Sequence, residues 1–158
     1  MSFAELMAEF GETYKVDGLV PDSDGGVSVG IDDFVVSFFC EPSGERLLVF
    51  SELAMECRAQ DDFILKRLLE ANYLFLQTSG ATLSANPDNG HVALCRTEPL
   101  EWMTVDRLSK LVDGFVNDLS VWKGLIEGYQ AIEGDLEGAR EREALGAQQL
   151  LSGEFTRI

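Results

Sequence analysis

The chain has 158 residues and a mass of 17.4 kDa, the size of a single domain. Hydrophobic residues make up 46% and charged residues 25%, which is enough apolar material for a packed core and argues against global disorder. The 28 acidic and 12 basic residues give a net charge of -16. This charge argues against binding to nucleic acid or docking on an anionic membrane, and favours a basic or neutral polypeptide partner.

Three features of the sequence bear on cellular location. No apolar run approaches the roughly 20 residues that a membrane-spanning helix needs, so we expect no membrane insertion. The first residues lack the basic and apolar segments of a secretion signal, which predicts a cytoplasmic protein. The three cysteines, Cys40, Cys57 and Cys95, form no CxxC pair, so we predict buried, reduced thiols and neither disulfides nor a zinc site.

The first predicted element is an amphipathic helix. Ser2 and Glu5 have the spacing of a capping box, in which each side chain satisfies a free backbone N–H group at the helix start. Large apolar side chains then recur along one stripe, at Phe3, Leu6, Met7, Phe10 and Tyr14. Two interpretations stay open, since the stripe can pack into the core or present part of its surface to a partner.

Three strands are predicted next, over residues 27–31, 34–40 and 46–53. The middle one is apolar at nearly every position, which is typical of a strand covered on both faces. The connections are too short for helical crossovers, so the strands should be antiparallel.

A second helix is predicted from about Asp61 to Phe75. Its apolar side chains span a broad arc, roughly 140 to 160° of the circumference at 100° per residue. An arc this wide is more than one sheet face requires. The helix therefore lies deep in the fold, or packs both on the sheet and on a second copy of the chain. The arc consists of Ile64, Leu65, Leu68, Leu69, Ala71, Phe75 and Leu76.

The second half of the chain predicts a hairpin and a third helix. Asn89-Gly90 between the segments 81–86 and 91–97 is a strong hairpin signal. Thr104 is a suitable N-cap for a helix that continues to about residue 130. The glycine-containing segment 131–158 should be a weakly helical or mobile tail that follows a domain over 1–130. The order α-β-β-β-α-β-β-α defines an α+β fold, with a twisted antiparallel sheet packed by helices.

The sequence offers no catalytic constellation. His91 is the only histidine, and Cys95 on the same predicted strand lies about 13 Å away at about 3.3 Å per residue. There is no phosphate-binding glycine loop and no metal-ligand spacing. We therefore predict no catalytic residues, no cofactor and no metal, and keep a small enzyme of unrecognised type only as a competing hypothesis.

The combination of elements resembles the class I type III secretion chaperones, the Tir-chaperone-like family of small acidic homodimers. The resemblance covers about residues 2 to 130 and is most specific in its second half. There, Leu68-Leu69-Glu70-Ala71-Asn72 is followed by Gly80, Leu83, Asn89-Gly90, Val92-Ala93-Leu94, Leu100 and a helix with Phe115 and Trp122. The segment 131–158 goes beyond a minimal member of that family.

This resemblance implies a homodimer that binds the N-terminal segment of a secreted effector in the bacterial cytoplasm. The effector segment would stay non-globular and secretion-competent without ATP hydrolysis. We assign effector binding to Phe3, Leu6, Met7, Phe10, Val35 and Phe39, and the dimer interface to Ile64, Leu65, Leu68, Leu69 and Phe75. An alternative with the same fold is a regulatory module that sequesters a folded regulator.

Overall fold

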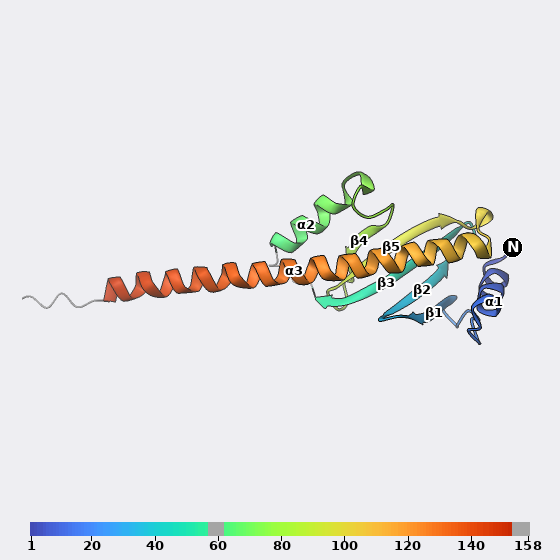
Figure 1. Ribbon diagram of the computed structural model, residues 1–158, viewed down its shortest axis with the longest axis horizontal. Coiled ribbons are helices and arrows are strands. Elements are labelled where there is room, and N and C mark those ends of the chain that lie inside the picture. Colours follow the sequence, from blue (N-terminus) through green and yellow to red (C-terminus); the bar gives the residue numbers. More distant parts are fainter. Residues whose placement is uncertain (57–61, 153–158) are drawn as a thin grey trace, which may run out of the picture.

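The computed structural model describes residues 1–56 and 62–152, and the predicted order of elements is confirmed. A first helix precedes three strands, a second helix precedes a β-hairpin, and a long helix follows (Figure 1). The elements are α1 (Phe3–Tyr14), β1 (Gly26–Ile31), β2 (Phe34–Cys40), β3 (Arg46–Glu56), α2 (Asp62–Asn72), η1 (Tyr73–Phe75), β4 (Thr82–Ala85), β5 (His91–Pro99), η2 (Leu100–Trp102) and α3 (Val105–Ser152).

All five strands form one antiparallel sheet in the order β1-β2-β3-β5-β4. The first two strands form a tight hairpin, in which Ile31 pairs with Phe34 across a two-residue turn. The second predicted hairpin is also present, with Leu83 opposite Leu94. β1 and β4 are consequently the two edge strands.

The helices cover one face of this sheet, here called the inner face. α3 lies along it, α1 packs near the start of α3, and α2 packs against α3 and β4 (Figure 1). Alternation along the strands directs one set of side chains to these helices. The core formed in this way includes Val36, Phe38, Leu47, Val49, Leu94, Leu108, Phe115, Leu119, Trp122 and Ile126.

The predicted starts of the first and third helices are confirmed in detail. Glu5 N–H donates to Ser2 Oγ at 3.3 Å, and Ser2 N–H donates to Glu5 Oε2 at 2.7 Å, which completes the capping box. At the start of α3, the N–H of Arg107 donates to Thr104 Oγ1 at 3.3 Å. Both caps satisfy donors that the first helical turn leaves unpaired.

The helix ends differ from the sequence prediction. α2 stops at Asn72 instead of Phe75, because Leu74 and Phe75 have positive φ angles of 54° and 57° that interrupt the helix. α3 continues past residue 130 to Ser152 and extends beyond the sheet (Figure 1). The predicted start of α2 at Asp61 lies outside the described residues.

Two of the cysteines can be placed. Cys40 and Cys95 are free thiols and are half-buried, so the prediction of buried thiols is only approximately met. Burial and the neighbouring Glu41 carboxylate raise the pKa of Cys40, which keeps its thiol protonated. Cys57 lies outside the described residues.

Candidate partner-binding surfaces

The apolar stripe of α1 belongs to the core. Phe3, Leu6, Met7 and Phe10 are all buried, and the Phe10 ring lies 6.3 Å from the ring of Phe38. The core interpretation of this stripe is therefore correct for these four residues, which expose very little surface to a partner. This corrects their assignment as an effector-binding patch, because periodicity identifies the apolar side of a helix but not what covers it.

The other two residues of that assignment lie on the uncovered outer face of the sheet. Val35 is 61% exposed, and the half-buried Phe39 ring stacks on Phe50 with centroids 5.6 Å apart. Leu48, opposite Phe39 in the register, is also half-buried. The prediction that β2 is covered on both faces is therefore wrong, since its outer side retains an apolar surface open to solvent.

The edge strand β1 leaves backbone groups available. Gly26 C=O faces away from β2, since it accepts a hydrogen bond from Asp22 N–H at 2.8 Å. Antiparallel pairing alternates, so the N–H and C=O groups of Ser28 and Gly30 point the same way. Within residues 1–56 and 62–152 these groups have no hydrogen-bond partner, which leaves an edge that another strand can join.

An apolar pocket lies beside this edge, between α1, β1 and α3. Its volume is about 210 Å³. Phe10 and Tyr14 contribute from α1, Gly30 and Ile31 from β1, and Val112 from α3. Phe10 thus reaches a partner-accessible cavity at one edge of its ring, although it is only 4% exposed.

The opposite edge of the sheet is partly closed. The Asn72 carboxamide donates to Leu83 C=O at 2.9 Å and accepts from Leu83 N–H at 2.8 Å. One side chain therefore occupies both outward backbone groups of Leu83, as a neighbouring strand would. β4 also has only four residues, so β1 is the more accessible edge.

The predicted dimer residues divide between the core and the surface. Ile64 and Leu68 are buried within the chain and Leu65 is half-buried, whereas Leu69 is 71% exposed and Phe75 about half-exposed. The apolar surface continues through residues that the assignment missed, Tyr73, Leu74 and Leu76. We call Leu69, Tyr73, Leu74, Phe75 and Leu76 the α2–η1 patch.

The sequence signal for the missed residues was the uninterrupted apolar run 73–76. An exposed group of five large apolar side chains is unusual on a monomeric protein and marks a contact surface. The left-handed backbone of Leu74 and Phe75 is also unfavourable for residues of this size. Both observations indicate that this surface is built for an interaction.

His91 belongs to a structural cluster at the β4–β5 turn. The Glu52 carboxylate accepts hydrogen bonds from Asn86 Nδ2 at 2.5 Å and Asn89 Nδ2 at 3.1 Å, and lies 3.1 Å from His91 Nδ1. These hydrogen bonds, that of Asn86 first, lower the pKa of Glu52. The cluster ties the hairpin to β3, and it contains no nucleophile.

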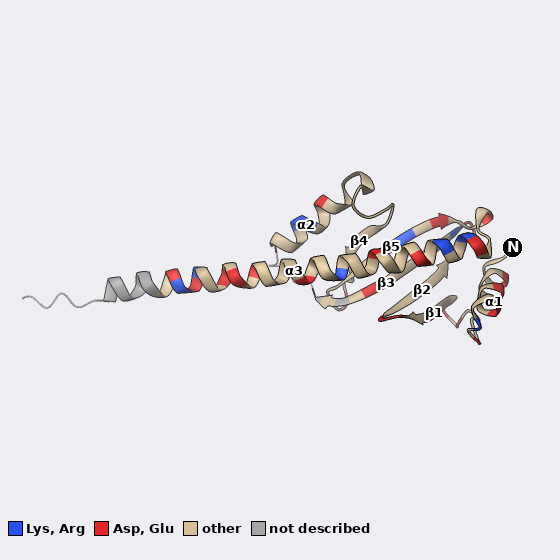
Figure 2. Cartoon of the chain, in the orientation of Figure 1, with Lys and Arg blue, Asp and Glu red and all other residues tan. Residues whose placement is uncertain are grey.

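Acidic and basic side chains are distributed differently over the fold. Figure 2 shows acidic side chains spread over most elements, and basic ones at fewer places, among them α2, the distal part of α3 and the region where β5 meets the first turns of α3. Within the described residues, no group of three or more His, Cys, Asp or Glu side chains is arranged to hold a metal ion. The described helices include none with the length and hydropathy to cross a membrane.

Comparison with known proteins gives one family. The model of the Tir chaperone protein (CesT) family matches residues 5–123, which include every strand and the first turns of α3. The extended part of α3 lies beyond the match. A comparison with curated proteins gives no significant match.

Several solved structures share the fold. A chain of the HopA1–SchA chaperone–effector complex is 22% identical, with a TM-score of 0.62 over 76% of this chain and 91% of that chain. A chain of the ExsC–ExsE complex is 18% identical, with a TM-score of 0.67 over 80% and 97%. A chain of the Yersinia pestis type III secretion chaperone SycH in complex with a YscM2 fragment is 17% identical, with a TM-score of 0.60 over 76% of this chain and 98% of that chain.

Proposed function

The chain belongs to the Tir chaperone protein (CesT) family of type III secretion chaperones, and on this premise we propose that it holds the N-terminal segment of a secreted effector. In this proposal it acts in the bacterial cytoplasm as a homodimer and keeps the effector segment non-globular until secretion. The observation that carries the proposal is the free edge of β1 beside an apolar pocket.

An effector segment that pairs with β1 would alternate its side chains between the two faces of the sheet. Side chains on the inner side would enter the pocket lined by Phe10 and Ile31. Side chains on the outer side would lie near Val35, which is opposite Gly30 in the register. Main-chain hydrogen bonds contribute affinity without demanding a particular sequence, which suits a partner held in extended form.

We propose the α2–η1 patch as the centre of the homodimer interface. A two-fold interface needs one surface that complements itself, and the patch offers five neighbouring apolar side chains. Leu69 and Phe75 remain in the assignment, and Tyr73, Leu74 and Leu76 join it. Ile64 and Leu68 belong to the core of the chain, and Leu65 is half-buried against it.

The proposed activity uses binding energy alone. Holding an extended segment shifts the effector away from its folded state by mass action, because the chaperone binds the extended form only. This step needs neither a nucleotide nor a reactive side chain.

Co-expression with the product of a neighbouring effector gene tests the proposal. We expect a stable complex in nucleotide-free buffer, with a mass by light scattering that corresponds to two chaperone chains and one effector. The effector segment should be sensitive to protease when it is free. A chaperone that stays monomeric and captures only folded proteins would contradict the proposal and favour the regulatory alternative.

A further inference from the structure

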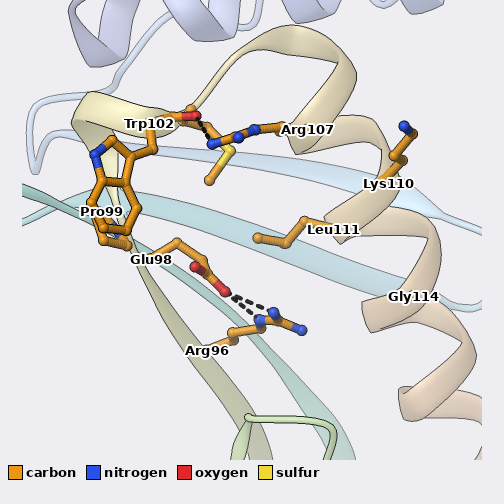
Figure 3. Close-up of a pocket in the computed structure, with 9 residues that line it drawn as sticks. Arg96, Glu98, Pro99, Trp102, Arg107, Lys110, Leu111 and Gly114 are labelled. Atoms are coloured by element: carbon orange, nitrogen blue, oxygen red, sulfur yellow. Dashed lines mark hydrogen bonds and ion pairs between the residues drawn. The ribbon is translucent and has the colours of Figure 1, made fainter.

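A pocket of about 320 Å³ lies on the β5 side of α3, away from the one beside β1. Figure 3 shows Trp102, Arg107 and Lys110 along one side of it and the Arg96–Glu98 pair along the other. Three of the 12 basic residues of the chain line this one cavity, together with a single carboxylate.

The four charges are not equivalent. Glu98 Oε1 accepts a hydrogen bond from Nε of Arg96 at 2.7 Å and forms an ion pair with Nη2 at 2.7 Å, so these two charges largely neutralise each other. Arg107 uses one N–H group to donate to Trp102 C=O at 2.8 Å and keeps its charge unpaired. Neither Arg107 nor Lys110 forms a salt bridge within the described part of the chain. The pocket is therefore a cationic site on a strongly acidic protein.

The remaining lining is apolar. Trp102 is 62% exposed, although burial of an indole ring is strongly favourable. Pro99, Met103 and Leu111 form the rest of the apolar wall. A fitting ligand thus combines an anionic group with an adjoining apolar one.

We propose that this pocket binds a segment of the partner polypeptide in which a Glu or Asp lies beside a large apolar residue. A carboxylate matches the forked guanidinium of Arg107 and the ammonium of Lys110. A free phosphate would leave Trp102 exposed, and the field of a chain with charge -16 opposes a doubly charged anion more than a single carboxylate. A basic segment would be repelled locally.

That this segment belongs to an effector rests on the proposed function. The pocket would then set the direction in which the effector segment binds. Basic stretches of the effector are attracted to most of the chaperone surface, whereas an acidic, apolar stretch is held at one place. Such a contact selects one direction and register for a partner whose main-chain hydrogen bonds select neither.

The two tryptophans provide the readout. In the ¹⁵N-labelled full chain, the indole N–H of Trp102 reports on the pocket, and that of Trp122, only 2% exposed, reports on the core. The probe is the capped peptide Gly-Leu-Glu-Glu-Leu-Gly, compared with its Gln and Lys counterparts and with inorganic phosphate. We expect a saturable shift of the Trp102 signal with the Glu peptide, and affinity about tenfold lower for the Gln peptide.

Two pairs of variants separate charge and shape from general effects. Arg107→Glu with Lys110→Glu should abolish the shift, whereas Arg140→Glu with Arg142→Glu, an equal charge change on the same helix, should not. Gly114 lines the pocket and Gly124 does not, so Gly114→Leu should block the pocket sterically and Gly124→Leu should not. An added Cβ meets nothing within 4 Å at either position, so both variants should fold. An unchanged Trp122 signal confirms that each variant is folded.

Equal shifts with Glu and Gln peptides, a saturable shift with phosphate alone, or retained binding in the Arg107/Lys110 variant would overturn the inference. Effector capture is measured separately by co-expression. Peptide binding without effector capture would contradict the proposed function alone, and capture without peptide binding would contradict the pocket alone.

Discussion

Glu52 shows how single side chains hold the β4–β5 hairpin. Its carboxylate accepts hydrogen bonds from Asn86 and Asn89 and contacts Nδ1 of His91, and all three residues flank or form the turn. Since the carboxylate is one-third exposed or less, its hydrogen bonds are only partly weakened by solvent. The turn signal Asn89-Gly90 thus has a second role, because Asn89 also supplies a donor to β3.

Stability should depend on the ionisation of this carboxylate. The pKa of Glu52 is lower in the folded protein than its ordinary value of 4.5, so the stabilisation is complete above that pH and is lost as the pH falls through the lowered value. We expect Glu52→Gln to reduce the free energy of unfolding by about 1 kcal/mol at pH 7 and to weaken the dependence of this free energy on pH below the ordinary value of 4.5.

Urea denaturation at several pH values measures this effect. Glu101→Gln is the matched control, since Glu101 is an exposed carboxylate on η2 without a hydrogen bond or salt bridge in the described residues. Equal losses in the two variants at pH 7, or an unchanged dependence on pH in Glu52→Gln, would show that the hydrogen bonds of Glu52 are not the cause.

Residue exposure was the part of the site that the sequence could not predict. The stripe of α1 was located correctly, but four of its five members, Phe3, Leu6, Met7 and Phe10, are buried in the core. A helix stripe of this kind looks the same in sequence whether a sheet or a partner covers it. One practical consequence is that Phe10→Asp should now unfold the protein, since it places a carboxylate in the core.

Among the elements, the two edge strands have different tasks. Asn72 blocks β4 at Leu83, whereas β1 presents the outward groups of Ser28 and Gly30. Ser28→Pro removes an N–H group that the sheet itself does not use, and proline is tolerated at such edge positions. We therefore expect a folded variant that captures the effector segment at least about tenfold less well.

Binding of a fluorescent effector segment, measured by anisotropy, tests this expectation. Ser28→Ala is the control, because it loses only the 2.8 Å side-chain contact with Ser37 and keeps the N–H group. If the proline variant binds as tightly as the alanine variant, the segment does not pair with β1.

The α2 helix gives a second comparison between neighbouring residues. Leu68 is buried and Leu69 is exposed in the α2–η1 patch, so identical substitutions should act differently. Leu69→Asp should yield a folded monomer, whereas Leu68→Asp should lower the melting temperature by 10 °C or more, because a buried unpaired carboxylate costs several kcal/mol. Light scattering and circular dichroism distinguish these outcomes, and a dimeric Leu69→Asp variant would remove the patch from the interface.

The order and type of the elements could be predicted because periodicity and turn signals are local. The end of α2 could not, since it depends on left-handed backbone at Leu74 and Phe75, which their residue types disfavour. The pocket at Trp102 and Lys110 could not be predicted from the sequence either, because it forms only when β5, η2 and α3 come together.

At the scale of the whole molecule, charge and exposed apolar surface are balanced. The net charge of -16 should limit non-specific association of the protein through the apolar outer face of the sheet, which holds the exposed Val35. Like-charge repulsion is weakest at high salt, where apolar surfaces are free to associate.

The packing of the long helix α3 changes along its length. Among the side chains of α3 described up to residue 145, the last buried one is Ile126, and the ring of Tyr129 makes an edge-to-face contact with that of Phe63 with centroids 6.1 Å apart. Beyond it, Ile132, Leu136 and Leu145 are about half-exposed or more. The division of the chain at residue 130 therefore stays a prediction with a direct test.

A chain truncated after Gln130 should keep the domain, because it retains every residue of the core. We expect its melting temperature to stay within about 3 °C of the full chain while helical ellipticity at 222 nm falls. Truncation after Ser120 is the contrasting variant, since it removes the buried Trp122 and Ile126, which should cost several kcal/mol and unfold the domain. If truncation after Gln130 instead lowers the melting temperature by 10 °C or more, or dissociates the dimer, the distal helix packs against a second copy and belongs to the folded unit.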